Sequence, residues 1–472
     1  MSAAPVFFRP APAWVGDVIP AEHDGVLHLW YLYDDRREPK PGMPWHLVTT
    51  TDFVAFQDRG EAVASGGPES DDFNIYTGSV AEGHDGTWHL FSTAQNPARR
   101  GVDGRPLQLV AHATSATPDG PWQKHPELTF GAPEGYESGD WRDPFVFHDG
   151  AVWRMLVAAR HADGPDRRRG TVAQLISDDL TSWAPVKPLW DPRRFVAHEC
   201  PDVFHWNGWW YLVYSEFTDA FCTRYRMARS LEGPWLAPED DAIDTRAFYA
   251  AKTVGRDGRR FFVGWIATRE GDSDDGRWQW AGTMAVLEAA QRADGSLAFH
   301  LPVELVSSFD APVASGLPEL PLTLSAHDSY RAVVGTEDLP ERFHLRAEVD
   351  IAAGSGPVGL LLRSDADGDR CGIVQLEPRR HRVVFDRWPR AATGTEQWQI
   401  SGDVPFEFER PVHLDAGRHT VEVLTDGELL VVIVDDQVAL STRFYAHHGS
   451  RIGFFASDGE AALVSLIINR RD

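Results

Sequence analysis

The chain has 472 residues, of which 43% are hydrophobic and 11% aromatic, and its formal net charge is −25. The length predicts two domains, because a single hydrophobic core rarely grows to this size. The negative charge argues against nucleic acid or an anionic membrane as a partner, since binding to phosphates needs basic surface. The three cysteines, Cys200, Cys222 and Cys371, are too few and too scattered for a disulfide framework or a zinc site.

The N-terminal segment, Met1 to Pro10, has no basic stretch followed by a long apolar one. No apolar run in the chain approaches the length of a membrane helix. We therefore expect a cytoplasmic protein without a membrane partner. The sequence leaves the oligomeric state open.

Residues 1–305 contain a repeated pattern, in which an Asp-Gly or Asn-Gly turn precedes a strand rich in Trp, Tyr and Phe. Such turns between apolar runs are a strong hairpin signal. The turn glycines lie 50 to 64 residues apart, and they are Gly25, Gly86, Gly150, Gly208 and Gly258. A further strand follows each turn, most irregularly around Thr283. Five such units predict a five-bladed β-propeller rather than a long β-sandwich.

A proline-punctuated segment, residues 306–318, predicts a linker. Beyond it, in residues 319–472, apolar and polar residues alternate with period two, for example in 343–350, 419–424 and 428–435. This pattern predicts a β-sandwich, so the fold class is all-β throughout. We expect the sandwich to support the propeller, with sugar binding as the alternative role.

One string in the second domain, Gly354 to Gly359, fits the dinucleotide-binding fingerprint. A nucleotide loop needs a helix after it, whose N-terminus faces the pyrophosphate. Here the residues that follow predict a strand. We therefore interpret the string as a hairpin loop.

Counting back seven to nine residues from the turn glycines reaches an acid in three of the five units. The acids are Asp17, Asp143 and Glu199, with Trp14, Trp141 and His198 beside them. In the other two units the same offset reaches Gly78 and Ala250. Equivalent positions of successive blades lie on one ring around the channel of a propeller. Three acids at matching offsets therefore favour a catalytic site over unrelated turns or structural ion pairs.

Enzymes that hydrolyse glycosides use such acids: an ionised carboxylate at the anomeric carbon and a protonated carboxyl group at the leaving oxygen. Carboxyl groups held close together raise the pKa of at least one of them, which keeps the proton donor loaded near neutral pH. This chemistry requires no metal or cofactor. The histidines also lack a metal-binding spacing such as His-Glu-x-x-His.

Four segments resemble the motifs of glycoside hydrolase family 32, which includes invertases, inulinases, levanases and fructan exohydrolases. They are Trp-Val-Gly-Asp at 14–17, Tyr-Thr-Gly-Ser at 76–79, Trp-Arg-Asp-Pro at 141–144 and His-Glu-Cys-Pro at 198–201. Residues 45–56 and 248–252 also resemble segments of that family. The resemblance spans the whole chain, since the family pairs a five-bladed propeller with a C-terminal β-sandwich.

The resemblance implies that Asp17 is the nucleophile that forms a fructosyl-enzyme ester and that Glu199 is the acid/base. Asp143 would stabilise the oxocarbenium-like transition state. The candidate substrate-binding residues are Trp14, Tyr76, Ser79, Trp141, Arg142, His198, Tyr249, Lys252 and Trp280.

The chain departs from the family pattern around the proposed nucleophile. The usual Asn before it is Gly16, the Pro-Asn-Gly after it is Val-Ile-Pro at 18–20, and the Gln expected on the first inner strand is Leu32. Those polar groups normally surround the fructosyl unit, so the resemblance does not extend to sucrose or ordinary inulin. An unusual fructoside, a modified disaccharide or a transfer reaction fits the divergence as well.

We therefore predict a retaining β-fructofuranosidase-like hydrolase that removes a terminal fructosyl unit from a small imported oligosaccharide, with fructosyl transfer left open. The substrate is expected to be small because long fructans do not enter cells. Two alternatives remain: an inverting arabinosidase or xylosidase of the family 43 type, with Asp17 as general base, and a non-enzymatic sugar-binding propeller.

A retaining pair places the carboxyl groups of Asp17 and Glu199 about 5–5.5 Å apart, whereas an inverting pair needs roughly 6.5–9.5 Å. In the retaining case we expect Asp17 to stay ionised, stabilised by hydrogen-bond donors around it.

Overall fold

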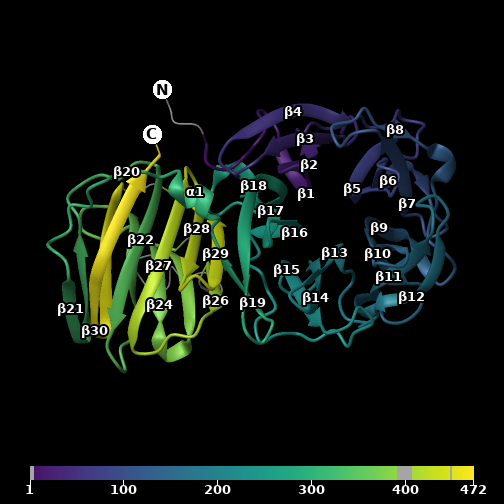
Figure 1. Ribbon diagram of the computed structural model, residues 1–472. Coiled ribbons are helices and arrows are strands. Elements are labelled where there is room, and N and C mark those ends of the chain that lie inside the picture. Colours follow the sequence, from purple (N-terminus) through teal and green to yellow (C-terminus); the bar gives the residue numbers. More distant parts are fainter. Residues whose placement is uncertain (1–4, 391–406, 447–448, 472) are drawn as a thin grey trace. The chain divides into compact units, whose positions relative to one another are not determined.

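The structure is a computed structural model that describes residues 5–390, 407–446 and 449–471 (Figure 1). Strands dominate these residues, which confirms the all-β class. The helical elements of the described residues are α1 (Val303–Ser307), η1 (Pro126–Leu128), η2 (Asp166–Arg168), η3 (Glu270–Asp272) and η4 (Pro378–Arg380). Among the described residues, no helix has the length and hydrophobicity needed to cross a membrane.

The chain forms two compact units. The first contains Phe8–Trp265 and Trp280–Ser296. The second contains Ile266–Gln279, the described residues from Leu297 onward and those before Phe8.

The first unit is built on antiparallel sheets in which strands that follow one another in the chain are neighbours. One sheet has the order β16-β17-β18-β1-β2-β3-β4. Its strands are β1 (Trp14–His23), β2 (Val26–Asp34), β3 (Trp45–Thr50), β4 (Phe56–Val63), β16 (Phe248–Arg256), β17 (Arg259–Arg269) and β18 (Trp278–Gln291). A second sheet contains β5 (Asn74–Glu82), β6 (Trp88–Arg100), β7 (Pro106–Ser115) and β8 (Gln123–Lys124).

The remaining sheets of this unit follow the same pattern. One contains β9 (Tyr136–His148), β10 (Trp153–His161), β11 (Gly170–Ser177) and β12 (Ala184–Trp190), and the other contains β13 (Glu199–Trp206), β14 (Trp209–Glu216) and β15 (Cys222–Ala228). Figure 1 shows β1, β5, β9, β13 and β16 nearest the centre of the unit, with β4, β8 and β12 on its outside. We call these five the first strands. This arrangement agrees with the predicted propeller architecture.

Each predicted turn joins a first strand to the next strand, which confirms the repeat. The five turn glycines have φ between 78° and 100°. In three turns the residue before the glycine also has positive φ, as in a type I′ turn, whose twist matches that of the paired strands. These residues are Asp24, Asn207 and Asp257.

Packing between successive sheets builds the core of the unit. One cluster combines Trp30, Trp45 and Leu47 with Ile75 and Leu90 of the next sheet. Similar clusters join β6 and β7 to β9–β11, and β1–β3 to β16–β18. Because each sheet buries both faces in this way, the first strands are held at the centre of the unit.

Four first strands contain a β-bulge. The pairing register shifts between Val15 and Val18, between Tyr76 and Gly78, opposite Leu156–Ala158 of β10, and between Glu199 and Asp202. The bulged residues include Asp17, Thr77, Asp143 and Cys200. A bulge bends its strand and redirects the side chains at that point. The offset found in the sequence thus corresponds to a shared irregularity of the first strands.

The second unit contains one large antiparallel sheet system with the order β26-β25-β24-β23-β30-β22-β27-β28-β29, to which β20 and β21 pair through β30. Its elements are β19 (Leu297–His300), β20 (Ala311–Pro312), β21 (Leu322–Val334), β22 (Arg342–Ile351), β23 (Val358–Ser364), β24 (Cys371–Glu377), β25 (Arg382–Trp388), β26 (Phe408–Pro411), β27 (Gly417–Asp426), β28 (Leu429–Val434), β29 (Val438–Arg443) and β30 (Arg451–Arg470). Most of their buried apolar residues form one large core, with a small second cluster around Leu361, Cys371 and Phe455, which agrees with the predicted sandwich.

The string 354–359 lies in the connection between β22 and β23, and no helix follows it. The interpretation of this connection as a hairpin loop was wrong. β22 and β23 each pair with β30 instead of with one another.

The bulge at Thr77 generates a test of the fold. A Cβ atom at Gly78 would lie 1.8 Å from the carbonyl oxygen of Phe91. We expect Gly78→Ala to lower the free energy of unfolding by about 2–3 kcal/mol, because the neighbouring strand must move. Gly25→Ala is the control: its site has φ of 78° and open space, so the cost should be about 1 kcal/mol. Urea denaturation measures both, and equal losses would contradict the close approach of β5 and β6.

Candidate active site

Cys200 contacts two of the predicted acids and directly follows the third. Its backbone N–H donates to Oδ2 of Asp143 at 2.9 Å, and its Sγ lies 3.8 Å from Oδ2 of Asp17. Glu199 precedes it at the start of β13. Cys200 has φ of 49°, a left-handed conformation that side-chain-bearing residues rarely adopt. The structure therefore brings together the three acids that the sequence places on different first strands.

Two side-chain donors hold the carboxylate of Asp17. Trp265 Nε1 donates to Oδ1 at 2.9 Å, and the hydroxyl of Thr77 donates to Oδ2. Burial nevertheless raises the pKa of Asp17 above its ordinary value, against the lowering effect of these donors. The donors agree with the expectation of a stabilised carboxylate, but the direction of the pKa shift is opposite to it. Burial outweighs the hydrogen bonds.

Neither donor to Asp17 was identified from the sequence. Thr77 lies inside the motif at 76–79, and its position in the bulge of β5 could have suggested a role. Trp265 lies near the end of β17, where one more buried aromatic residue gives no signal of function.

Asp143 is 4% exposed and has φ of 59° in the bulge of β9. Its backbone N–H donates to Oγ1 of Thr93 at 2.7 Å, which ties the bulge to β6. Burial raises the pKa of Asp143 to about 7; the charge of Arg142 lowers it, and that of Glu199 raises it further. This carboxyl therefore titrates near neutral pH.

Glu199 accepts hydrogen bonds on both oxygens. Arg142 Nη2 donates to Oε1 at 3.2 Å, and the hydroxyl of Tyr249 donates to Oε2 at 2.6 Å. Burial, together with the charge of Glu199, raises the pKa of Tyr249 well above its usual value, so this hydroxyl remains a donor. The Glu199 side chain is 22% exposed, and so it is open to solvent.

Arg142 connects the acids to a further carboxylate. Its Nη1 donates to Oδ1 of Asp140 at 2.5 Å, and its Nε lies 3.9 Å from Oδ2 of Asp143. Although burial opposes its charge, the carboxylates of Glu199, Asp140 and Asp143 raise the pKa of Arg142. A permanent positive charge therefore lies beside the acids. Asp140 was not identified from the sequence.

Lys252 provides a second buried cation. Its Nζ donates to the carbonyl oxygen of Gly78 at 2.6 Å, and the side chain is nearly inaccessible. Burial lowers the pKa of Lys252, while the charges of Cys200, Asp202 and Asp143 act against this shift. Lys252, predicted to bind substrate, is therefore a buried residue whose hydrogen bond goes to the backbone of β5.

Three other residues predicted to bind substrate have contacts within the protein, a hydrogen bond in one case and aromatic packing in the other two. Ser79 Oγ accepts from the N–H of Val146 at 2.9 Å. Trp141 is 1% exposed and packs on Tyr136. His198 is fully buried, and burial lowers its pKa to about 3. Its ring is enclosed by Trp190, Phe195 and Tyr214.

The predicted residues that remain accessible are Trp14, Tyr76 and Trp280. Trp280 is 36% exposed and meets Trp265 edge to face at 6.2 Å between ring centroids. Trp265 in turn meets Tyr249 at 5.6 Å. An aromatic wall, formed by Trp280, Trp265 and Tyr249, therefore extends from Asp17 to Glu199.

The ring of Trp280 occupies the space beside Gly16. A Cβ atom at Gly16 would lie 2.5 Å from Cη2 of Trp280 and 2.9 Å from Cβ of Leu32. Gly16 and Leu32 are two of the positions at which the chain departs from the family pattern. Trp280 and Leu32 thus both lie close to Gly16 and leave no room for a side chain there.

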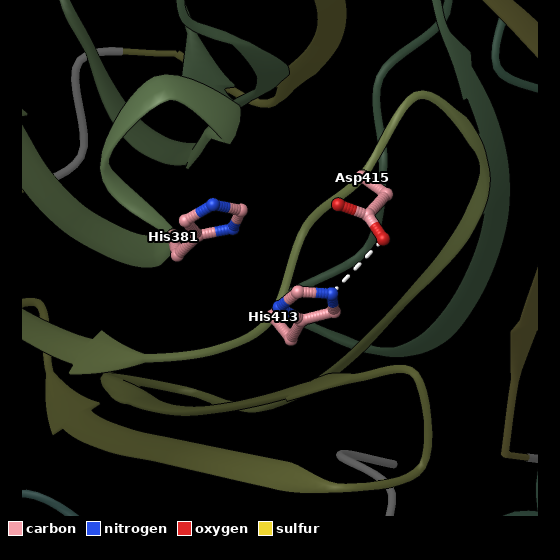
Figure 2. A group of neighbouring side chains, drawn as sticks. All are labelled: His381, His413 and Asp415. Atoms are coloured by element: carbon pink, nitrogen blue, oxygen red, sulfur yellow. Dashed lines mark hydrogen bonds and ion pairs between the residues drawn. The ribbon is translucent and has the colours of Figure 1, made fainter.

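One group of described side chains could approach a metal ion: His381, His413 and Asp415, whose ligand atoms lie within 4.8 Å of one another (Figure 2). His413 Nε2 pairs with Asp415 Oδ2 at 2.9 Å, and Leu414 N–H donates to His381 Nδ1 at 3.2 Å. The last bond leaves the proton of a neutral His381 on Nε2, the atom that would otherwise bind the metal. This exposed group belongs to the second unit and takes no part in the acid site.

Comparison with known families identifies the chain. Residues 8–298 match the glycosyl hydrolases family 32 N-terminal domain, and residues 325–469 match the glycosyl hydrolases family 32 C-terminal domain. The chain belongs to glycosyl hydrolase family 32, which confirms the resemblance.

Its relatives are distant in sequence. It is 26% identical over 294 residues to the sucrose-6-phosphate hydrolase of Vibrio alginolyticus, an alignment that covers 58% of each protein. It is 24% identical over 480 residues to the raffinose invertase of Escherichia coli, covering 97% of this chain and 93% of that enzyme. The solved structure of exo-inulinase from Aspergillus awamori has a TM-score of 0.79 at 18% identity and covers 100% of this chain and 99% of that one. This last likeness concerns the fold.

The packing of Gly16 against Trp280 yields a prediction. We expect Gly16→Ala to displace the ring and to lower stability by about 1–3 kcal/mol. Adding Trp280→Ala should recover part of the loss, since the contact with Cβ of Leu32 remains, so that a double-mutant cycle measured by urea denaturation shows a coupling of about 0.5–3 kcal/mol. Trp388→Ala removes another exposed tryptophan, in the second unit, and should not rescue Gly16→Ala. Additive effects of Gly16→Ala and Trp280→Ala would contradict the contact.

The pKa of Asp143 predicts how stability depends on pH. An unfolded aspartate titrates near 3.9, whereas burial raises the pKa of Asp143 to about 7. Between these values the folded state binds the proton more tightly, so stability contributed by this group falls as pH rises through the window. Asp143→Asn keeps an oxygen for the Cys200 N–H and should be more stable than wild type at pH 8, by at most about 4 kcal/mol. At pH 4 the difference should vanish. Urea denaturation at both pH values measures this, and a constant difference would contradict it.

Proposed function

We propose that this chain is a retaining β-fructofuranosidase-like glycoside hydrolase. Asp17 is the nucleophile, Glu199 the acid/base, and Asp143 the residue that stabilises the transition state. The observation that carries the proposal is the convergence of the three acids on Cys200, in a chain that belongs to family 32.

The mechanism follows from the contacts of each acid. Glu199 gives its proton to the leaving oxygen while Asp17 attacks the anomeric carbon, which forms an ester between enzyme and sugar. Glu199 then takes a proton from water, and the water opens the ester. The donors Thr77 and Trp265 hold the Asp17 carboxylate in one orientation before and after attack.

Asp143 and Arg142 act on the sugar and on the developing charge. Asp143 accepts hydrogen bonds from sugar hydroxyls in its ionised form, and the positive charge of Arg142 favours that form. The Cys200 N–H holds one oxygen of Asp143, leaving the other for the sugar. Charges fixed in advance in a buried site stabilise a transition state without reorganisation.

The substrate we propose is a small fructoside from which a terminal fructosyl unit is removed, by hydrolysis or by transfer to another sugar. Relatives named for sucrose-6-phosphate and for raffinose support the fructoside class. The aromatic wall beside Gly16 supports a substrate that differs from theirs at the contact with Asp17. The alignments span 58% of the sucrose-6-phosphate hydrolase of Vibrio alginolyticus and 56% of that enzyme from Staphylococcus xylosus. The activity of the whole protein is therefore a proposal.

The proposal keeps five blades in residues 1–305, a linker at 306–318 and a β-sandwich in 319–472. The single pairing Val15↔Gly282 between β1 and β18 supports division of the largest sheet into two blades. The family matches at 8–298 and 325–469 fall inside the two proposed domains. A cytoplasmic location completes the proposal.

The test is turnover of a panel of fructosides and arabinosides by purified protein. We expect release of fructose and, by early NMR, retention of the anomeric configuration. Glu199→Gln should lower turnover by about 10²–10⁴-fold and keep sugar binding, and Asp17→Ala should abolish the covalent intermediate.

Other outcomes favour the alternatives. Inverted first products would identify Asp17 as a general base and exclude the retaining mechanism. Sugar binding without turnover of any glycoside would identify a binding module.

A further inference from the structure

Asp140 is the centre of a buried charge cluster beside the acids. Its Oδ1 accepts from Arg142 at 2.5 Å, and its Oδ2 accepts from Arg105 at 2.6 Å and from Arg160 at 3.3 Å. Asp140 is 8% exposed. Burial opposes its charge, but Arg142 and Arg105 hold the pKa of Asp140 below its ordinary value. An ionised carboxylate is therefore shared among three arginines.

Glu137 is the other acid of this cluster, and its contacts differ in one respect. It pairs with Arg105, with Arg169 at 2.6 Å and with Arg160 at 3.7 Å. Among the ion pairs of the described residues, those of Arg142 are with Asp140, Asp143 and Glu199. Both acids thus pair with Arg105 and Arg160, and of the two it is Asp140 that reaches Arg142.

Arg142 lies beside two acids whose proposed roles differ: Asp143 acts in its ionised form, whereas Glu199 has to carry a proton. A guanidinium 3.2 Å from Glu199 favours the anionic form of that group. A general acid must keep its proton until the leaving oxygen takes it. Asp140 binds Nη1 of Arg142 and so offsets part of the positive charge that would otherwise act on Glu199.

We propose that Asp140 is a positioning residue, which holds Arg142 between the acids and weakens its pull on Glu199 so that Glu199 can carry the catalytic proton. The proposal rests on the proposed role of Glu199 as acid/base. Asp140 acts through Arg142 and does not touch the substrate.

Charged and titratable groups of the first strands β1, β9, β13 and β16 interact with Glu199. They are Asp17 on β1, Arg142 and Asp143 on β9, Cys200 on β13 and Tyr249 on β16. Asp140 changes the balance of this group through Arg142, whereas Glu137 does not contact any of its members in the described ion pairs.

The test compares the pH profile of kcat/KM for wild type, Asp140→Asn and Glu137→Gln on a fructoside with a poor leaving group. In Asp140→Asn the full charge of Arg142 faces Glu199. The basic limb of the profile should therefore move to lower pH by at least about half a unit. Activity at pH 8 should fall more for a sugar leaving group than for an activated aryl one, which needs less protonation. Glu137→Gln should move the limb much less than Asp140→Asn, because Glu137 reaches Asp140 only through Arg105 and Arg160.

Arg105→Gln provides a variant of opposite sign at a partly exposed residue. Without Arg105, more of the Asp140 charge acts on Arg142, and the basic limb should move to higher pH. If the cluster had a purely structural role, the basic limb would shift in the same direction in Asp140→Asn, Glu137→Gln and Arg105→Gln, or in none of them. Either result would overturn the proposal.

A measurement without substrate separates this proposal from the proposed function. A carboxyl group makes stability depend on pH only between its pKa values in the unfolded and folded states, so the stability of wild type and of Glu199→Gln is compared by urea denaturation from pH 4 to pH 9 to locate any divergence. With Asp140→Asn in both backgrounds, the divergence should move to lower pH. An unmoved divergence refutes the role of Asp140 even if the wild type hydrolyses fructosides. A moved one supports it even if no fructoside is turned over.

Discussion

The gathering of three carboxyl groups around Cys200 is the constraint on which the rest of the first unit depends. A carboxylate taken out of water costs several kcal/mol unless hydrogen bonds or opposite charges replace its hydration. Asp17 obtains donors from β5 and β17, Asp143 from β13, and Glu199 from β9 and β16. Since each acid is satisfied by other strands, the site can exist only when the sheets pack around a common centre. Fold and site are therefore one energetic unit.

The positions of the acids were predictable, and the orientations of their neighbours were not. The offset from the turn glycines is a property of strand length, which the sequence displays directly. Whether a neighbouring side chain faces the centre or the core between sheets depends on the alternation of the strand and on where a bulge interrupts it. His198 and Trp141 lie in the same motifs as Glu199 and Asp143 but turn into aromatic packing. Thr77 was missed because the bulge of β5 points it at Asp17.

The departures from the family pattern around Asp17 could likewise be explained only from the structure. Taken singly, Gly16 and Leu32 are lost polar groups. In three dimensions the absence of a side chain at Gly16 makes room for the ring of Trp280, and Leu32 borders the same position, so that no side chain fits there. Lys40 Nζ lies over this ring at 5.6 Å from the centroid, which holds it further. Sites that exchange polar contacts for one large aromatic residue change as a set, because each single replacement would create a clash or a cavity.

The charges of the site also act as a set. Asp17, Asp143 and Glu199 face two buried cations, Arg142 and Lys252, and Asp140 is offset by Arg105 and Arg160. Acids outnumber cations in this group, since the buried Asp202 also acts on Lys252. Low polarity disfavours the excess of negative charge, and a bound proton reduces it. Interacting acids share such a proton, so its loss is a property of the cluster and not of a single residue. The mechanism proposed above needs one proton in the resting site, and the arrangement of charges favours holding it there.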